Sequence, residues 1–370
     1  MNLEHLVDLL DKTPVLVNMH PVARCFLPED IMIYTSLEEL LQVLDSPECT
    51  SAHRMLVVDP GVPRHHRFPF VRCEHDPFTP ELNNVLYSQF DFIEQHMLTQ
   101  RDIAGVIASA ASDYDVVVLF LVDGLSYRDL CRPGTGLRPW TVEPCLVNGP
   151  TKTSTGFRNL VGDPPLAARL FDMGFHRRLG LTHWYREDNV LADYLFRGIA
   201  QTQKVGHFSQ VLATMEEWLT TTERPKGYVQ ILLTGLDGYA HGQKRKPPVN
   251  DIVDDVLEEF MRLAKLLEEV GVAARLWLSA DHGILWRDEF EPEVIGAAPG
   301  KVNPRCAEWS ALYCQREPGR RFNLYGEEVY CLNYPKVRRP LHIDDQGIHG
   351  GISFQESIVP FVTMEIIPDD

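Results

Sequence analysis

Three apolar segments, each closed by an aspartate, constrain the fold of this 370-residue chain more than any other feature. They are VVVLFLVDG (116–124), YVQILLTGLDG (228–238) and ARLWLSADHG (274–283). Uninterrupted apolar runs of this length are typical of strands in a parallel sheet that is buried on both faces. Between the last two, residues 250–271 carry apolar side chains at helical spacing, which predicts a crossover helix. The sequence therefore predicts an α/β fold with a mostly parallel central sheet and helices on both faces.

The aspartates that end these segments are predicted to meet. In an open parallel sheet, ligands bind beyond the carboxyl ends of the strands. Asp123, Asp237 and the pair Asp281–His282 would therefore face one edge. A single aspartate at a strand end more often only caps the next helix. Three such positions, two of them with a histidine beside or near them, favour a functional cluster.

The first part of the chain reads as a separate region. Residues 1–110 alternate strand-like and helix-like runs, which predicts an N-terminal α/β region of unassigned role. Within it, the segment 60–82 is rich in proline and polar residues and is predicted to be a linker or a long loop. Residues 111–370 would form the main domain, with an inserted basic segment at about 284–345.

Composition limits the classes of function. The formal net charge of −17 argues against coating of nucleic acid by the whole surface. The eight cysteines contain no C-x-x-C pair, which indicates reduced thiols and a cytoplasmic protein. The longest apolar run is too short to span a bilayer, so no membrane partner is expected.

Histidines near the aspartates suggest a metal site. His241 follows Asp237 by four residues, a spacing that places both on one face of a helix. Asp281 and His282 are adjacent, and His349 lies in the glycine-rich stretch GIHGG. Carboxylate and imidazole groups together suit Zn²⁺, Mn²⁺ or a similar divalent ion.

The order of these motifs resembles the alkaline phosphatase superfamily of two-metal phospho- and sulfo-transferases. The resemblance covers residues 115–365, from the strand-end Asp123 through the hydroxyl-rich loop PTKTST to D-x-x-x-H, D-H and a late histidine. The tail HGGISFQESIVPFVTMEI is most similar to PglZ-type domains, and PTKT is similar to the nucleophile loop of nucleotide pyrophosphatases/phosphodiesterases.

The resemblance implies a role for each motif residue. One divalent ion, Zn²⁺ before Mn²⁺ or Mg²⁺, would be held by Asp237, His241 and His349. A second ion would be held by Asp123, Asp281 and His282, with the hydroxyl of the nucleophile as a further ligand. Two such ions could clamp the attacking and leaving oxygens of a displacement at phosphorus.

The nucleophile implied by the same match is Thr153, with Thr155 and then Ser154 as alternatives. The residues that follow can begin a helix, and a helix N-terminus favours a phosphate group. Related phosphodiesterases carry an asparagine three residues after the nucleophile, where this chain has Gly156. Arg158, Asn159 or backbone N–H groups are the expected substitutes. A hydroxyl-rich turn without chemistry is the competing interpretation.

Residues 301–339, within the inserted segment, reverse the acidic balance of the chain, which suggests a surface that meets an anion, with Arg305 as a substrate contact. An ordinary mixed-charge hairpin is an equally open interpretation. Aromatic residues of this region could stack on a base or form a small core. The cations are Lys301, Arg305, Arg316, Arg320, Arg321, Lys336, Arg338 and Arg339, and the aromatic residues are Trp286, Trp309, Tyr325 and Tyr334.

Together these features predict a metal-dependent phosphoric ester hydrolase. The favoured substrate is a phosphodiester, in a nucleotide, a nucleic acid or a similar anion. A phosphomutase or phosphomonoesterase could use the same site. The resemblance to PglZ-type domains also leaves open a regulatory scaffold without turnover, acting with partner proteins of a phage-defence or signalling system.

Overall fold

The computed structural model describes residues 9–18, 31–34, 37–46, 54–58, 63–72, 83, 86–131, 141–183, 189–221, 226–298, 302–308 and 319–368. The chain divides into two compact units, Met1–His96 and Met97–Asp370. Each unit is described separately below. Within the described residues, no helix combines the length and the apolar character that crossing a bilayer requires.

The first unit contains a parallel sheet of order β2-β3-β1-β4. A small core of apolar side chains, including Leu16, Leu40 and Val57, lies between this sheet and helix α2. Strand β4 falls inside the segment that the sequence predicted to be a linker or loop, and it pairs with β1. The elements are β1 (Val15–Asn18), β2 (Met32–Tyr34), α2 (Leu37–Leu44), β3 (Met55–Val58), β4 (Phe70–Arg72) and α4 (Phe90–His96).

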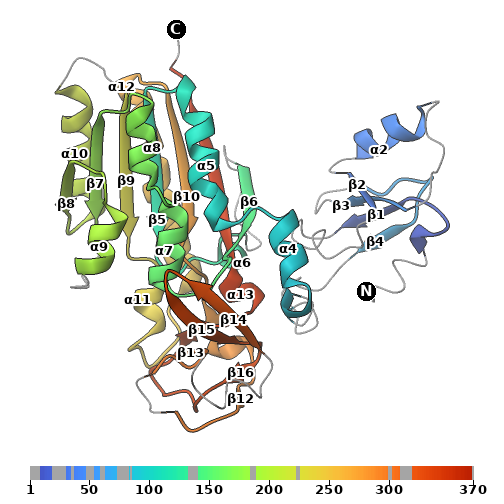
Figure 1. Cartoon of the computed structure of the whole chain (residues 1–370). Helices are drawn as coiled ribbons and strands as arrows, with labels where there is room; N and C mark the ends of the chain where they lie inside the picture. The colour runs from blue at the N-terminus through green and yellow to red at the C-terminus, as the bar shows by residue number, and fades with distance from the viewer. Residues whose placement is uncertain are drawn as a thin grey trace. The chain divides into compact units, whose positions relative to one another are not determined.

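The second unit is built on a seven-stranded sheet of order β6-β18-β10-β5-β9-β7-β8 (Figure 1). Only β18 runs against its neighbours, so the sheet is mostly parallel, as the sequence predicted. The strands are β5 (Val116–Val122), β6 (Thr141–Leu146), β7 (Arg177–Thr182), β8 (Gln201–Lys204), β9 (Gly227–Leu233), β10 (Ala274–Ala280) and β18 (Ile358–Ile366).

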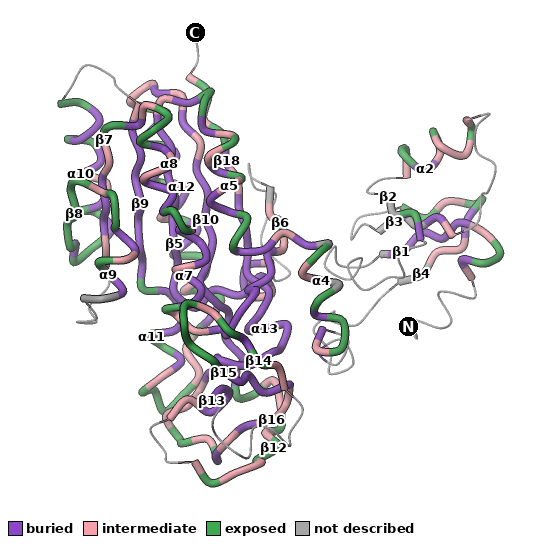
Figure 2. The backbone as a smooth tube through the Cα atoms, viewed as in Figure 1, coloured by how far each residue is buried: buried purple, intermediate pink, exposed green. Residues whose placement is uncertain are grey.

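The three apolar segments form the centre of this sheet. Strands β10, β5 and β9 are neighbours, and every residue of β5 and β9 is buried (Figure 2). Burying both faces removes whole Val, Leu and Phe side chains from water, which stabilises the fold by roughly 1.5–3 kcal/mol per side chain. This burial explains why the strands read as uninterrupted apolar runs instead of alternating ones.

Helices cover both faces of the sheet, as predicted. The crossovers from β6 to β7 and from β9 to β10 move in opposite directions across it, so right-handed connections place their helices on opposite faces. Helices α5, α7 and α8 pack together, and α10 packs on α12. The helices are α5 (Gln100–Ala110), α6 (Tyr127–Leu130), α7 (Thr153–Val161), α8 (Leu166–Asp172), α9 (Asn189–Leu195), α10 (Phe208–Thr220), α11 (Asp237–Ala240), α12 (Val249–Val270) and α13 (Phe354–Ser357).

Helix α12 is the crossover helix predicted at 250–271. Its buried positions include Val253, Phe260 and Leu267, which form one stripe, while its charged residues face outward. Gly271 ends the helix in the left-handed conformation, with φ of 68°, which glycine adopts without a steric cost.

Helix α5 belongs to the second unit, whereas the sequence analysis set the boundary near residue 110. The helix packs on α7 and α8, and its first residue, Gln100, donates to the carbonyl oxygens of Ala280 and Asp281 at 2.8 Å each. The amphipathic pattern of α5 predicts that one face of the helix is buried, but it does not say which unit that face packs on.

The inserted segment after β10 folds into short strands. Three of them form a sheet of order β13-β15-β14, and two further pairs are β11–β17 and β12–β16. Because the segment starts where β10 ends, it lies at the carboxyl edge of the central sheet (Figure 1). The strands are β11 (Leu285–Trp286), β12 (Glu293–Val294), β13 (Cys306–Glu308), β14 (Gly319–Leu324), β15 (Glu327–Leu332), β16 (Lys336–Val337) and β17 (Gly347–Ile348).

Candidate active site

Adjacent parallel strands bring the predicted aspartates to one edge. Asp123 follows β5, Asp237 begins α11 just after β9, and Asp281 and His282 follow β10. All four side chains are buried. Because β10, β5 and β9 are neighbours with in-register parallel pairing, their carboxyl ends lie side by side.

The histidines complete two groups of metal-ligand type. Oδ1 of Asp237 lies 3.3 Å from Nε2 of His241 and 3.2 Å from Nε2 of His349. Nε2 of His282 lies 3.9 Å from Oδ1 of Asp123. In each group the donor atoms lie within 4.8 Å of one another; the groups are Asp237, His241 and His349, and Asp123, Asp237 and His282.

The second group differs from the predicted ligand set in one member. It contains Asp237 where the resemblance implied Asp281. Oδ1 of Asp281 instead accepts a hydrogen bond from the N–H of Gly124 at 2.9 Å, and Oδ2 lies 3.2 Å from Nε2 of His282. Asp281 therefore stays in contact with the cluster, but one of its oxygens is committed to the backbone.

The donor set fits a divalent cation. Nδ1 of His282 lies 3.1 Å from the carbonyl oxygen of Gly283, which can only accept, so Nδ1 carries the proton. In the neutral ring, Nε2 is then an acceptor that faces Oδ2 of Asp281, a buried oxygen that accepts no hydrogen bond from any described residue. Buried acceptors that point at one another require a proton or a cation between them.

The same cluster shifts the pKa values of its members. Burial raises the pKa of Asp281 to about 7, and the charge of Asp237 adds to this effect. Burial and the charge of His349 hold the pKa of His282 well below its usual value. Burial opposes ionisation of Asp237, but its interactions with His349 and His241 outweigh burial and hold its pKa well below the usual range. At neutral pH, His282 is therefore the neutral imidazole that metals require.

Thr151 orients His349. Nδ1 of His349 lies 2.8 Å from the carbonyl oxygen of Thr151, which leaves Nε2 to face Asp237. The hydroxyl of Thr151 donates to the carbonyl oxygen of Gly351 at 3.0 Å and accepts from the N–H of Gly350 at 2.8 Å. The ring of His349 also stacks on that of His282, with centroids 4.0 Å apart. The PTKTST loop and the GIHGG loop are thus tied together.

Among the three candidate nucleophiles, Thr153 is the one in contact with the cluster. Its Oγ1 lies 3.3 Å from Nε2 of His282, and its side chain is half-buried. Ser154 is exposed, and Thr155 is buried beside a cavity. Thr153 is also the first residue of α7, so the first N–H groups of that helix have no helical acceptor and point toward the same end.

Close packing explains the glycine at position 156. A Cβ at Gly156 would lie 2.0 Å from the carbonyl oxygen of Asp281, so no side chain fits where α7 crosses the end of β10. Asn159 does not replace the missing asparagine, because it is buried and accepts a hydrogen bond from the hydroxyl of Tyr325 at 2.6 Å. Asn159 was expected to contact the substrate, but the structure shows its side chain bonded to Tyr325 instead. The N–H groups of α7 remain as candidates to hold the reacting phosphoryl group, whereas the guanidinium of Arg158 lies against the rings of Tyr194 and Tyr325.

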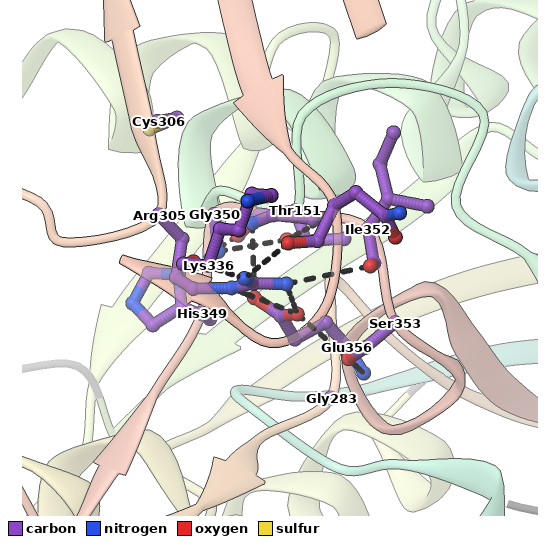
Figure 3. A network of polar contacts seen from close by, with 12 residues as sticks. Thr151, Gly283, Arg305, Cys306, Lys336, His349, Gly350, Ile352, Ser353 and Glu356 are labelled. Atoms are coloured by element: carbon purple, nitrogen blue, oxygen red, sulfur yellow. Dashed lines mark hydrogen bonds and ion pairs between the residues drawn. The ribbon is translucent and has the colours of Figure 1, made fainter. Parts of the chain in front are cut away.

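Arg305 has a structural role, which corrects the predicted substrate contact. It is 0% exposed, and its Nη2 lies 2.8 Å from Oε2 of Glu356, which is also buried (Figure 3). Its Nη1 donates to the carbonyl oxygens of Asn333 and Lys336, and its Nη2 also faces that of Ile352. With all its nitrogens engaged inside the protein, Arg305 has no donor left for a substrate.

Other basic residues of the inserted segment are also engaged. The described ion pairs are Arg321–Glu328, Lys336–Glu293 and Arg339–Asp345. Lys301, Trp309 and Arg316 lie outside the described residues. Trp286 is fully buried, whereas Tyr325 is 44% exposed. The mixed-charge hairpin is therefore the better description of this segment, with Tyr325 as its exposed aromatic side chain.

Sequence reasoning assigned no role to three residues that support the site, namely Gln100, Thr151 and Glu356. Gln100 holds the end of β10, and Thr151 holds His349. Glu356 accepts from the N–H of Gly351 and the hydroxyl of Ser353, and so fixes the loop after His349 (Figure 3). The positions of Thr151 in the PTKTST loop and of Glu356 in the C-terminal tail were signals, whereas Gln100 does not stand out in the sequence.

Comparisons with known proteins find similarity in solved structures alone. No protein-family model matches the chain. No curated protein matches it. Murine ectonucleotide pyrophosphatase/phosphodiesterase 5 is similar, with a TM-score of 0.49 and 13% identity over 67% of this chain and 87% of that one. A structure of the same murine protein holds AMP.

Two bacterial structures are similar at lower scores. Phosphonoacetate hydrolase from Sinorhizobium meliloti gives a TM-score of 0.36 and 15% identity over 70% of this chain and 92% of that one. The C-terminal periplasmic domain of EptC from Escherichia coli, in complex with Zn, gives 0.35 and 13% over 68% and 73%. At these scores and identities, the similarities do not assign the chain to a family.

Proposed function

We propose that the chain is a metal-dependent phosphoryl-transfer enzyme that hydrolyses phosphoesters, with nucleotide-like phosphodiesters as the favoured substrates. One observation carries the proposal. Three adjacent parallel strands deliver Asp123, Asp237 and Asp281–His282 to one edge, where the hydroxyl of Thr153 lies 3.3 Å from Nε2 of His282. Carboxylates, imidazoles and a hydroxyl at this spacing form a set that can hold divalent ions beside a nucleophile.

The chemistry divides between the metal ions and the chain. Divalent ions held by these carboxylates and imidazoles would offset the charge that develops on the phosphoryl oxygens and favour the ionised hydroxyl. Oγ1 of Thr153 would attack phosphorus, forming a phosphothreonine as the bond to the leaving alcohol breaks. N–H groups in the first turn of α7 would donate to the phosphoryl oxygens. Water would then displace Oγ1 of Thr153 from phosphorus and restore the hydroxyl, releasing a phosphomonoester when the substrate is a diester and phosphate when it is a monoester.

The test uses a bis-aryl phosphodiester and an aryl phosphomonoester, with Zn²⁺, Mn²⁺ or Mg²⁺ added to protein that has been stripped with EDTA. Thr153→Ala should lower kcat by at least about 1000-fold, because it removes the group that forms the covalent bond. Ser109→Ala, which removes an exposed hydroxyl from α5, is the matched control. Activity that survives in Thr153→Ala but is lost in Thr155→Ala would move the nucleophile to Thr155.

Competing functions give different products from the same assay. A hydrolase places an oxygen from labelled water in the released phosphomonoester or phosphate, whereas a phosphomutase returns the phosphoryl group to the substrate and incorporates none. A PglZ-type scaffold would bind metal without turnover. The PglZ-type interpretation rests on the sequence of the tail. Turnover with no metal added after stripping would contradict the proposed chemistry.

A further inference from the structure

A cavity of about 270 Å³ opens beside the first turn of α7. One wall consists of helix residues that directly follow Thr153, including Ser154 and Thr155. The tip of the β14–β15 hairpin contributes Leu324 and Tyr325 to the lining, and this hairpin lies near the start of α7 (Figure 1). The cavity therefore adjoins the proposed nucleophile without containing any of the metal-ligand candidates.

Arg158 supplies this cavity with a cation that forms no ion pair with any described residue. Its guanidinium carbon lies 4.9 Å from the ring centroid of Tyr194 and 5.3 Å from that of Tyr325. No described residue forms a hydrogen bond or an ion pair with it, although its Nε is buried. This state contrasts with Arg305 and Arg339, whose charges meet carboxylates. Aromatic faces stabilise a guanidinium but leave its N–H groups free to donate.

The hairpin tip is fixed against α7, so the cavity is preformed. The hydroxyl of Tyr325 donates to Oδ1 of Asn159 at 2.6 Å, and Asn159 is itself buried. The same bond holds the Tyr325 ring over Arg158. A binding group that is held in place by its neighbours loses less entropy when a ligand arrives.

We propose that this cavity binds a second anionic group, a phosphate or a carboxylate, carried by the phosphoester substrate. The proposal rests on the function proposed above and names the substrate class of that site. Arg158 stands five residues after Thr153, a rise of roughly 7 Å along the helix axis. The second anion is thus several bonds away from the reacting phosphorus. Glu327, an exposed residue of the lining, limits the strength of binding through its like charge.

Two matched aryl phosphodiesters test the proposal. One carries a propanediol arm that ends in phosphate, and the other carries the same arm ending in hydroxyl. We expect the wild type to prefer the phosphate-ended arm by about 10- to 100-fold in kcat/KM, the range of a charge-assisted guanidinium contact. Arg158→Gln should remove this preference while it keeps turnover of the hydroxyl-ended substrate. Glu327→Gln should increase the preference.

The control is Lys265→Gln, which removes one positive charge from α12, where Lys265 pairs with Glu269. It should keep the full preference, so that loss of net charge alone is excluded. An unchanged preference in Arg158→Gln, or equal kcat/KM for the two substrates in the wild type, would overturn the assignment of the cavity.

A binding measurement separates this proposal from the proposed function. Calorimetry on the full chain compares propanediol bisphosphate with propanediol monophosphate, for the wild type and Arg158→Gln. If neither diester is hydrolysed but the bisphosphate binds more tightly in an Arg158-dependent manner, the cavity assignment stands and the hydrolase assignment fails. If the diesters are hydrolysed but the bisphosphate binds no more tightly than the monophosphate, the hydrolase assignment stands and the cavity assignment fails.

Discussion

The buried ion pair between Arg305 and Glu356 gives the most direct test of how this site is supported. The Glu356→Gln variant keeps the size of the side chain and removes its charge. Arg305 would then hold a buried positive charge with no carboxylate beside it, since both side chains are fully buried and Nη2 and Oε2 lie 2.8 Å apart. The new amide would also place N–H donors against the guanidinium.

The expected loss of stability follows from that geometry. Removing one partner of a fully buried ion pair costs about 3–5 kcal/mol, because the remaining charge has lost both water and counter-charge. For a domain of this size, such a loss lowers the unfolding midpoint by roughly 6–20 °C. The loop at Gly351 and Ser353, which Glu356 holds, should also loosen, so metal affinity at His349 should fall.

Urea unfolding followed by circular dichroism measures the change, and equilibrium dialysis measures the metal affinity. The double variant Arg305→Met with Glu356→Leu removes both charges and should recover part of the lost stability. Glu356→Gln within about 1 kcal/mol of the wild type would refute the structural role. If the Arg305→Lys variant had a higher KM but unchanged stability, that result would instead support a substrate-binding role for Arg305.

Three further predictions address packing, protonation and metal. Gly156→Ala should destabilise by at least about 2 kcal/mol in urea unfolding, because its Cβ would meet the carbonyl of Asp281 at 2.0 Å; Gly238→Ala, with nothing within 4 Å of its Cβ, should be close to neutral. Burial raises the pKa of Asp281 to about 7, so its contribution to the stability of metal-free protein is lost as pH rises from about 4 through 7. In Asp281→Asn, the midpoint of thermal unfolding should therefore depend less on pH across that range. Asp237→Asn should lower the bound metal measured by atomic absorption, since Asp237 contributes to both ligand groups; unchanged metal content would contradict that role.

Much of the fold was accessible from local pattern. The apolar runs that became β5, β9 and β10 were recognisable because burial on both faces leaves no position for a polar side chain. The helix at 250–271 was recognisable from its stripe and its terminal glycine. The boundary between the units was placed elsewhere, because the pattern of α5 does not say which sheet it covers.

The candidate site divides in the same way. Asp123, Asp237 and Asp281–His282 could be predicted to meet, because the ends of parallel strands share an edge. Which of the basic residues are buried in ion pairs and which stay at the surface could not be predicted from the sequence. Arg305 reads like any other arginine of its segment, and only its burial against Glu356, 51 residues later, removes it from the surface.

The sequence by itself determined the class of fold and the order of the chemical groups, since both depend on residues that lie near one another along the chain. The tertiary structure decided which hydroxyl faces the histidines and why position 156 must be glycine. Thr153 and His282 are 129 residues apart, and the contact between Gly156 and Asp281 exists only where α7 crosses the end of β10. Contacts of this kind arise from close packing of distant segments, for which a single sequence carries no local pattern.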